Sequence, residues 1–143
     1  IVMPAWRHTE DDFNAFNRES LIPHMLSTQG PPMAVGDCNG DGLDDMYVGG
    51  AKGQSGVLMI QTSTGSFITK SVADMVIHRQ AEETDAAFLD ADGDGDLDWY
   101  CVSGGTELGK GEENYNDRLY FNDGKGNFTL NTQSLPVIRA SGS

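Results

Sequence analysis

The sequence predicts an all-β fold built from two repeats of four short strands. Three observations lead to this prediction. The 143-residue chain contains 18 glycines and only 8% aromatic residues, a composition that suits short strands joined by many tight turns. A stretch of the chain recurs about fifty residues later, and the acidic residues gather in two clusters within the recurring part. No stretch approaches the roughly 20 apolar residues of a membrane helix, so we expect no membrane insertion.

The internal repeat is the strongest pattern in the chain. Residues 34–47 match residues 87–100, and residues 58–67 match residues 119–128 with a larger offset. The change in offset implies additional residues in the second copy, which we place in the polar stretch 104–116. Insertions of this kind belong in loops, so the two copies are expected to share one framework of strands.

Alternating apolar residues bounded by turn residues indicate four strands in each copy. The strands expected in the first copy are 33–35, 46–49, 57–61 and 66–69, and those in the second are 86–89, 99–103, 118–122 and 127–130. The Asp123-Gly124 pair before an aromatic strand is a typical hairpin signal.

The segments outside the strands complete the expected organisation. Residues 1–30 form an N-terminal segment that is expected to pack on the repeats. A short helix is predicted within residues 10–18, where Asp11 and Asp12 precede apolar positions. Residues 72–83 between the repeats fit either a helical turn or an irregular crossover. The domain limits expected from these patterns are 1–30 for the N-terminal segment, 31–83 for the first repeat and 84–143 for the second repeat.

The acidic residues argue for a bound cation. The formal net charge is −13, which disfavours nucleic acid or anionic lipid as a partner. Nine aspartates lie in the two clusters, and like charges at this density repel each other unless a cation neutralises them. A disordered acidic tail is the plain alternative, but apolar runs bracket both clusters. The clustered residues are Asp37, Asp41, Asp44 and Asp45, and Asp90, Asp92, Asp94, Asp96 and Asp98.

Both clusters have the donor spacing of a calcium loop. Calcium takes six to eight oxygen ligands, and oxygen-bearing side chains recur here at every second position. The side-chain donors expected are Asp37, Asn39, Asp41 and Asp45 in loop 37–45, and Asp90, Asp92, Asp94 and Asp98 in loop 90–98. Leu43 and Asp96, at the seventh position of each loop, would offer their backbone carbonyls. The intervening glycines allow the backbone to curl through positive φ, so that alternate side chains converge.

Four other interpretations of the loops are weaker. An EF-hand needs a glutamate at the twelfth position and a helix on each side, whereas Val48 or Cys101 stands there between strand-like runs. A dockerin-type loop fails at the same position, and Mg²⁺ is less suited to a cage so rich in protein ligands. Solvated Asp-Gly turns without metal would explain one loop better than two matching loops.

The same motifs resemble those of a known family, the FG-GAP or VCBS repeats, which are similar to the repeats in the β-propeller of integrin α chains. The resemblance covers roughly residues 31–130. Within the family, the sequence looks most like the repeats of large secreted or surface-anchored bacterial proteins. The motifs that carry it are VGDCNGDGLDD at 35–45, VGGA at 48–51 and FNDGKGNF at 121–128.

The resemblance implies that each repeat is one four-stranded antiparallel propeller blade and that the acidic loop links its first two strands. Two blades cannot close a propeller, so it implies a partial β-propeller with further repeats of a parent chain as partners. The open sheet edges would otherwise invite self-association. The liganding positions carry over to the donors named above, with two structural Ca²⁺ ions.

These features together predict a calcium-binding module of a larger secreted or cell-surface protein, located in an extracellular, cell-surface or periplasmic setting. It is expected to bind a protein or glycan ligand in adhesion and not to be an enzyme. The alternative is a part of a propeller-type carbohydrate-active enzyme, for which the sequence offers scattered carboxylates and His8, His24 and His78. Insertion 104–116 is a candidate contact loop, although a solvated acidic loop is the simpler interpretation. Cys38 and Cys101 are expected to be buried or half-buried thiols, with a disulfide between them as the alternative that no sequence pattern supports.

The proposed register of the first loop can be tested at Leu43. If only the Leu43 carbonyl faces the ion, Leu43→Asn should leave the calcium affinity nearly unchanged, because the side chain takes no part in binding. Calorimetric titration of the variant measures this affinity. A large loss of affinity would show that the alternate-position register is wrong.

Overall fold

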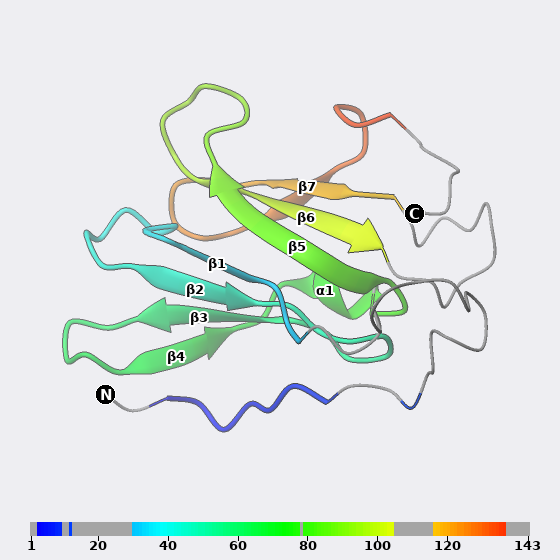
Figure 1. The fold of residues 1–143 in the computed structure, drawn as a ribbon. Coiled ribbons are helices and arrows are strands. Elements are labelled where there is room, and N and C mark those ends of the chain that lie inside the picture. The colour runs from blue at the N-terminus through cyan, green and yellow to red at the C-terminus, as the bar shows by residue number, and fades with distance from the viewer. Residues whose placement is uncertain (1–2, 10–11, 13–29, 78, 105–115, 137–143) are drawn as a thin grey trace.

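Two separate four-stranded antiparallel sheets make up the fold, which confirms the predicted all-β class (Figure 1). The computed structural model describes residues 3–9, 12, 30–77, 79–104 and 116–136. In each sheet the strands follow one another in chain order. Sheet 1 contains β1 (Met33–Gly36), β2 (Asp45–Val48), β3 (Val57–Gln61) and β4 (Phe67–Lys70). Sheet 2 contains β5 (Glu82–Leu89), β6 (Asp98–Gly104), β7 (Arg118–Phe121) and β8 (Thr129–Asn131).

The observed strand limits agree with the sequence analysis within two residues, apart from the start of β5. That strand begins four residues before the expected position 86. A helical turn, α1 (Ala73–Ile77), occupies part of the linker whose structure the sequence left open. The helix predicted within residues 10–18 and most of insertion 104–116 fall outside the described residues. No helix among the described residues has the length and apolarity needed to cross a membrane.

The main core lies between the two sheets. Period-two alternation turns Tyr47 and Leu58 of sheet 1 towards Trp99 and Tyr120 of sheet 2. The Trp99 ring stacks on Tyr120 with a centroid distance of 4.3 Å and an interplanar angle of 13°. Its centroid is also 4.3 Å from that of Tyr47. Trp99 is 1% exposed, so this side chain joins the repeats at the centre of the interface.

The other face of sheet 1 carries a second apolar cluster, formed by Val48, Val57 and Met59 with Trp6 packed against them. Residues 3–9 run beside β4 (Figure 1). Gln54 holds them there, because its Nε2 donates to the Arg7 carbonyl and its Oε1 accepts from the Thr9 N–H. Within residues 3–9, Trp6 therefore packs on the face of sheet 1 that points away from sheet 2.

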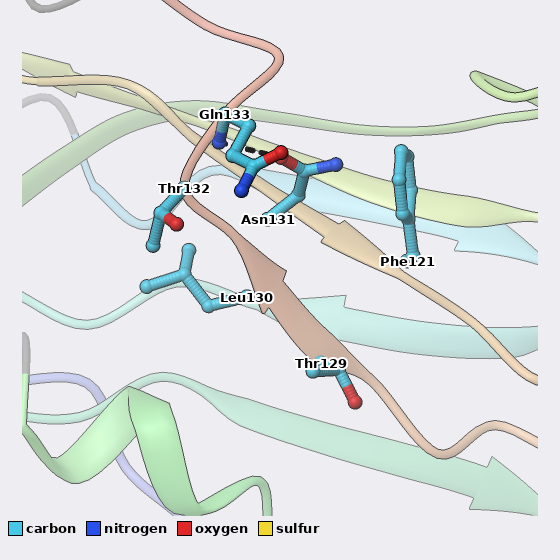
Figure 2. A pocket seen from close by; sticks show the side chains of 6 residues that line it. All are labelled: Phe121, Thr129, Leu130, Asn131, Thr132 and Gln133. Carbon is cyan, nitrogen blue, oxygen red and sulfur yellow. Dashed lines mark hydrogen bonds between the residues drawn. The ribbon is translucent and has the colours of Figure 1, made fainter.

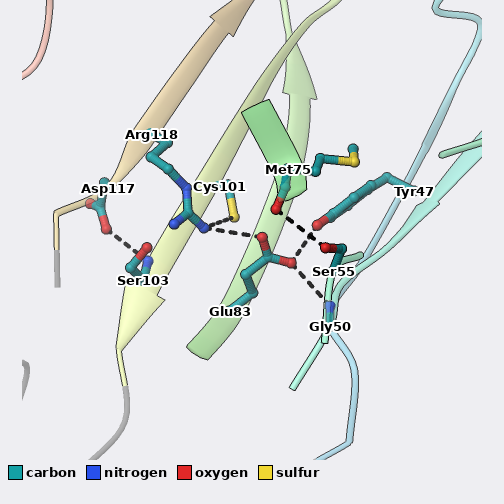
Figure 3. A network of polar contacts seen from close by, with 9 residues as sticks. All are labelled: Tyr47, Gly50, Ser55, Met75, Glu83, Cys101, Ser103, Asp117 and Arg118. Carbon is teal, nitrogen blue, oxygen red and sulfur yellow. Dashed lines mark hydrogen bonds and ion pairs between the residues drawn. The ribbon is translucent and has the colours of Figure 1, made fainter. Parts of the chain in front are cut away.

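A β-bulge explains the early start of β5 and creates a polar link between the sheets. The pairing with β6 shifts between Glu83 and Asp85, which puts Glu83 opposite Ser103 on the inward face. Figure 3 shows the Glu83 carboxylate accepting from the Tyr47 hydroxyl and, at 3.1 Å, from the Gly50 N–H. Tyr47 lies in β2 of sheet 1 and Gly50 follows that strand, whereas Glu83 lies in β5 of sheet 2, so Glu83 links one sheet to the other.

The buried end of the same network lies in sheet 2. Arg118 forms an ion pair with Glu83 at 3.0 Å, and both side chains are at most 10% exposed. Its guanidinium also donates to the Cys101 thiol at 3.3 Å. A buried carboxylate of this kind is tolerable because it is both paired and hydrogen-bonded.

The second repeat satisfies the equivalent tyrosine differently. Tyr100 and Ser103 occupy the positions that correspond to Tyr47 and Gly50. The Tyr100 hydroxyl and the Ser103 N–H donate to the two carboxylate oxygens of Asp117, a residue of the same repeat. Figure 3 shows the bond from Ser103. The hydrogen bond to Asp117 and partial burial raise the pKa of Tyr100 to about 12.

Truncation of the central tryptophan should weaken the packing between the two sheets. Trp99→Ala removes the side chain that contacts both Tyr47 and Tyr120, so we expect the free energy of unfolding to fall by about 3–5 kcal/mol. Urea denaturation measures this change. Met33→Ala, at a strand position that is 60% exposed, is the control and should change stability by less than about 0.5 kcal/mol. Equal effects of the two substitutions would contradict the assignment of the core.

Candidate metal centre

The two acidic loops lie at the same end of the molecule (Figure 1). One connects β1 to β2 and the other connects β5 to β6. In each loop two glycines have positive φ, with values of 74° and 84° at Gly40 and Gly42, and 82° and 97° at Gly93 and Gly95. Residues with a Cβ rarely adopt this conformation. The glycines therefore give both loops the curled backbone that the sequence analysis expected.

The last aspartate of each loop is a buried structural acceptor. Asp45 is 0% exposed and Asp98 is 1% exposed. Asp45 accepts from the Cys38 N–H at 3.2 Å and from the Gln61 N–H at 2.8 Å. Each of these carboxylates thus joins the start of its loop, the strand that follows the loop and the next strand in the sheet.

Asp98 repeats this arrangement in the second repeat. It accepts from the Ala91 N–H at 2.9 Å and from the Asn122 N–H at 2.9 Å. Ala91 corresponds to Cys38, and Asn122 corresponds to Gln61. The internal sequence repeat is therefore also a repeat of hydrogen bonds, and it fixes the position of one carboxylate in each loop.

The second loop brings three aspartates together. One carboxylate oxygen from each of Asp90, Asp92 and Asp98 lies within 4.8 Å of the other two. Among the residues that the structure describes, no other group of three His, Cys, Asp or Glu side chains meets this separation. Asp94 and Asp96 stand outside the group, although the Asp94 carboxylate accepts from the Asp96 N–H at 3.1 Å.

The electrostatics of the second loop favour a cation. Loss of hydration in the crowded loop raises the pKa of Asp92 and of Asp96, and the charges of Asp94 and Asp98 raise both pKa values further. The Asp96 Oδ1 atom is buried and has no hydrogen-bond partner among the described residues. A divalent ion bound to Asp90, Asp92 and Asp98 would relieve the repulsion between the carboxylates of the loop.

The first loop is held more by its own backbone. Asp37 accepts from the Gly40 N–H and the Gly42 N–H, each at 2.8 Å, and from the Asp41 N–H at 3.1 Å. These bonds, led by the one from Gly42, lower the pKa of Asp37. Asn39 Oδ1 also accepts from the Asp41 N–H, while Asn39 Nδ2 donates to the Asp41 carboxylate. The loop thus has one amide and three carboxylates at the expected donor positions, with less crowding of charge.

The donor types fit calcium in both loops, and in the second loop three carboxylates also converge. Carboxylate, amide and carbonyl oxygens are the ligands that this hard cation prefers, and the described donors include neither histidine nor a free thiolate. Cys38 lies within the first loop, but its thiol is buried and donates to Asp45 at 3.0 Å. Burial and this contact raise the pKa of Cys38, so the sulfur stays protonated. Cys101 is also a buried free thiol, as the sequence predicted for both cysteines.

Sequence reasoning missed one functional residue of this region, Asn122. Its side-chain Nδ2 donates to the Cys38 carbonyl of the first loop at 2.6 Å and to the Leu97 carbonyl of the second loop at 2.9 Å. The only signal was its place in the FNDG motif, which the sequence analysis used for the family resemblance. Its partners lie 84 and 25 residues away in the chain, so a single sequence gives no indication of either bond.

Two of the histidines named for the alternative function, His24 and His78, lie outside the described residues. Figure 2 shows a shallow pocket along β8 that is lined by neutral side chains. The lining residues are Phe121, Thr129, Leu130, Asn131, Thr132 and Gln133.

Fold and site together define a class: a protein of propeller-type four-stranded blades with an acidic loop between the first two strands of each blade. Residues 37–101 match the family model of the FG-GAP-like repeat, which confirms the FG-GAP part of the resemblance predicted from the motifs, while the VCBS part stays a prediction. The matched segment begins at Asp37 and includes both acidic loops. A comparison with curated proteins gave no match.

The structural role of the buried carboxylates can be measured without metal. In the presence of EDTA, Asp45→Ala leaves the Cys38 and Gln61 N–H groups without their acceptor, which should lower the free energy of unfolding by about 1–3 kcal/mol. Urea denaturation gives the value. Asp44→Ala, at the exposed neighbour, should change it by less than about 0.5 kcal/mol. Equal stability of the two variants would contradict the structural role.

Proposed function

We propose that this chain is a calcium-binding FG-GAP-type module of a larger secreted or cell-surface protein. Two Ca²⁺ ions stabilise its blades, and the module acts in binding a protein or glycan ligand. The single observation that carries the proposal is the convergence of Asp90, Asp92 and Asp98, with ligand atoms within 4.8 Å of one another. The family match over both loops supports it independently.

The residues that would hold each ion follow from the repeat. In the second loop they are Asp90, Asp92, Asp94 and Asp98 with the carbonyl of Asp96, and in the first they are Asp37, Asn39, Asp41 and Asp45 with the carbonyl of Leu43. Bound calcium supplies positive charge that offsets the repulsion between the carboxylates, so its binding free energy adds to the stability of the fold.

The proposed role of each ion is structural, because protein oxygens would fill its coordination sphere and leave little room for a substrate. The fifth donor of each set is a backbone carbonyl, and one carboxylate of each set is already buried in the sheet. An ion bound in this way rigidifies the hairpin and takes no part in a reaction. We further propose that the module is not itself an enzyme.

The proposal places the protein outside the cytosol because the calcium affinity expected of such loops is low. Calcium modules of extracellular proteins bind with dissociation constants of about 10⁻⁴–10⁻³ M, which suffices only where calcium is millimolar. The first loop, with one amide in place of a carboxylate, is expected at the weaker end of that range because affinity rises with ligand charge.

Further repeats of a parent chain are the proposed partners within the protein. The strands β1 and β4 form the edges of sheet 1, and β5 and β8 form those of sheet 2. Met33, Val35 and Ile68 on the edge strands of sheet 1 are 57–61% exposed. Exposed apolar side chains on an open edge favour contact with a neighbouring blade or with a second copy of the chain.

Calcium titration tests the proposed function directly. Calorimetry of the EDTA-treated protein should show two calcium ions per chain, and thermal melts should show a higher Tm with calcium than with an equal concentration of magnesium. Asp94→Ala should remove the second site and Asp41→Ala the first, each leaving one ion per chain. Unchanged stoichiometry in both variants, or no binding by the wild-type protein, would refute the proposal.

A further inference from the structure

Asn122 is placed between the two acidic loops and touches both. It stands directly after β7, where its N–H donates to Asp98 at 2.9 Å. Its amide Nδ2 donates to the Leu97 carbonyl, beside Asp98, and to the Cys38 carbonyl of the first repeat. The second repeat therefore fixes a peptide group of the first loop through one side chain.

The peptide that Asn122 holds is part of the first site. Cys38 lies between the expected donors Asp37 and Asn39. Its N–H donates to Asp45 at 3.2 Å, while its carbonyl accepts from Asn122 at 2.6 Å. The backbone N–H and carbonyl of Cys38 are thus both hydrogen-bonded, the N–H within its own repeat and the carbonyl to the second repeat. A change in the position of Asn122 would alter how the two flanking donors are presented.

The hairpin that follows Asn122 also contacts the first repeat. Lys70 Nζ donates to the Lys125 carbonyl at 2.9 Å. A Cβ on Gly126 would lie only 3.5 Å from the Cys38 sulfur and 3.6 Å from the Asn39 Cβ. The segment from Asn122 to Gly126 is therefore packed against the first loop, so the Asn122 contact is one part of a wider junction.

We propose that Asn122 is a positioning residue that couples calcium binding at the two loops, so that an ion in one loop strengthens binding in the other. This inference rests on the calcium-binding function proposed above. An ion in the second loop fixes the segment that contains Leu97 and Asp98, and these residues hold Asn122 at two points. The ordered Asn122 then holds the Cys38 peptide without a further loss of conformational entropy. By thermodynamic linkage, the effect is equal in the other direction.

The first repeat supplies a matched control at Gln61. Its N–H donates to Asp45 as that of Asn122 donates to Asp98. Its side chain, in contrast, makes no hydrogen bond to the second repeat within the described residues. Gln61→Ala and Asn122→Ala therefore leave equivalent backbone contacts intact, and only the second substitution removes a bridge between loops.

The experiment is a cycle of calcium titrations on the full chain. The dissociation constant of the first loop is measured with the second loop functional and with the second loop disabled by Asp94→Ala. We expect disabling the second loop to weaken the first loop about five-fold or more. In the Asn122→Ala background the same comparison should give a ratio near one. In the Gln61→Ala background the ratio should remain at the wild-type value.

A role of Asn122 in stability alone would lower both affinities but preserve the ratio, and that result would overturn the coupling. A ratio near one in the wild-type protein, with two ions bound, would overturn the coupling and leave the proposed function intact. Failure of the wild-type protein to bind calcium would overturn both.

Hydrogen exchange provides a test that does not require Asn122→Ala to fold. In Asp41→Ala, where only the second loop should bind, calcium is expected to slow exchange of the Cys38 and Gly42 amides in the first loop. Unchanged exchange there, together with slowed exchange in the second loop, would also overturn the coupling.

Discussion

A buried carboxylate at the end of each acidic loop is the constraint on which the rest of the structure depends. Asp45 and Asp98 are almost fully buried, and a charge in such a place is tolerable only when its oxygens are hydrogen-bonded. Backbone N–H groups from the loop and from the third strand supply those bonds. The same pair of bonds closes the loop, sets where the second strand begins and ties it to the third. Loop shape and sheet register thus have a single cause.

The interface between the sheets places the two loops side by side. Trp99 fills its centre and stacks on Tyr120, and the bulge in β5 turns Glu83 towards the first repeat. Apolar packing supplies most of the attraction here, while the polar link of Glu83 with Tyr47 and Arg118 fixes one relative placement of the sheets. Since that placement brings Asn122 to the Cys38 carbonyl, the core determines the geometry around the loops.

The sequence predicted those parts of the fold that depend on local patterns. Alternation of apolar residues gave the strands, and the acidic spacing with its glycines gave the curled loops, because both patterns act over only a few residues. It could not predict that Asp45 and Asp98 would be buried acceptors as well as candidate ligands, since their partners Gln61 and Asn122 lie 16 and 24 residues away. The bulge at Glu83 was missed for a related reason. A one-residue change in pairing has no local signature when both alternate faces contain acidic residues.

The acid that satisfies each blade tyrosine comes from a different source in the two repeats. Tyr47 depends on Glu83 of β5 in the following sheet, whereas Tyr100 obtains the equivalent contact from Asp117, which directly precedes β7 of its own sheet. The two repeats are consequently not interchangeable in order, although their loops and strands correspond. A duplication that placed a copy of β1–β4 at the end of an array, with no copy of β5 after it, would leave the tyrosine hydroxyl of that copy without an acceptor. A copy of the second repeat carries its own acceptor and could stand there.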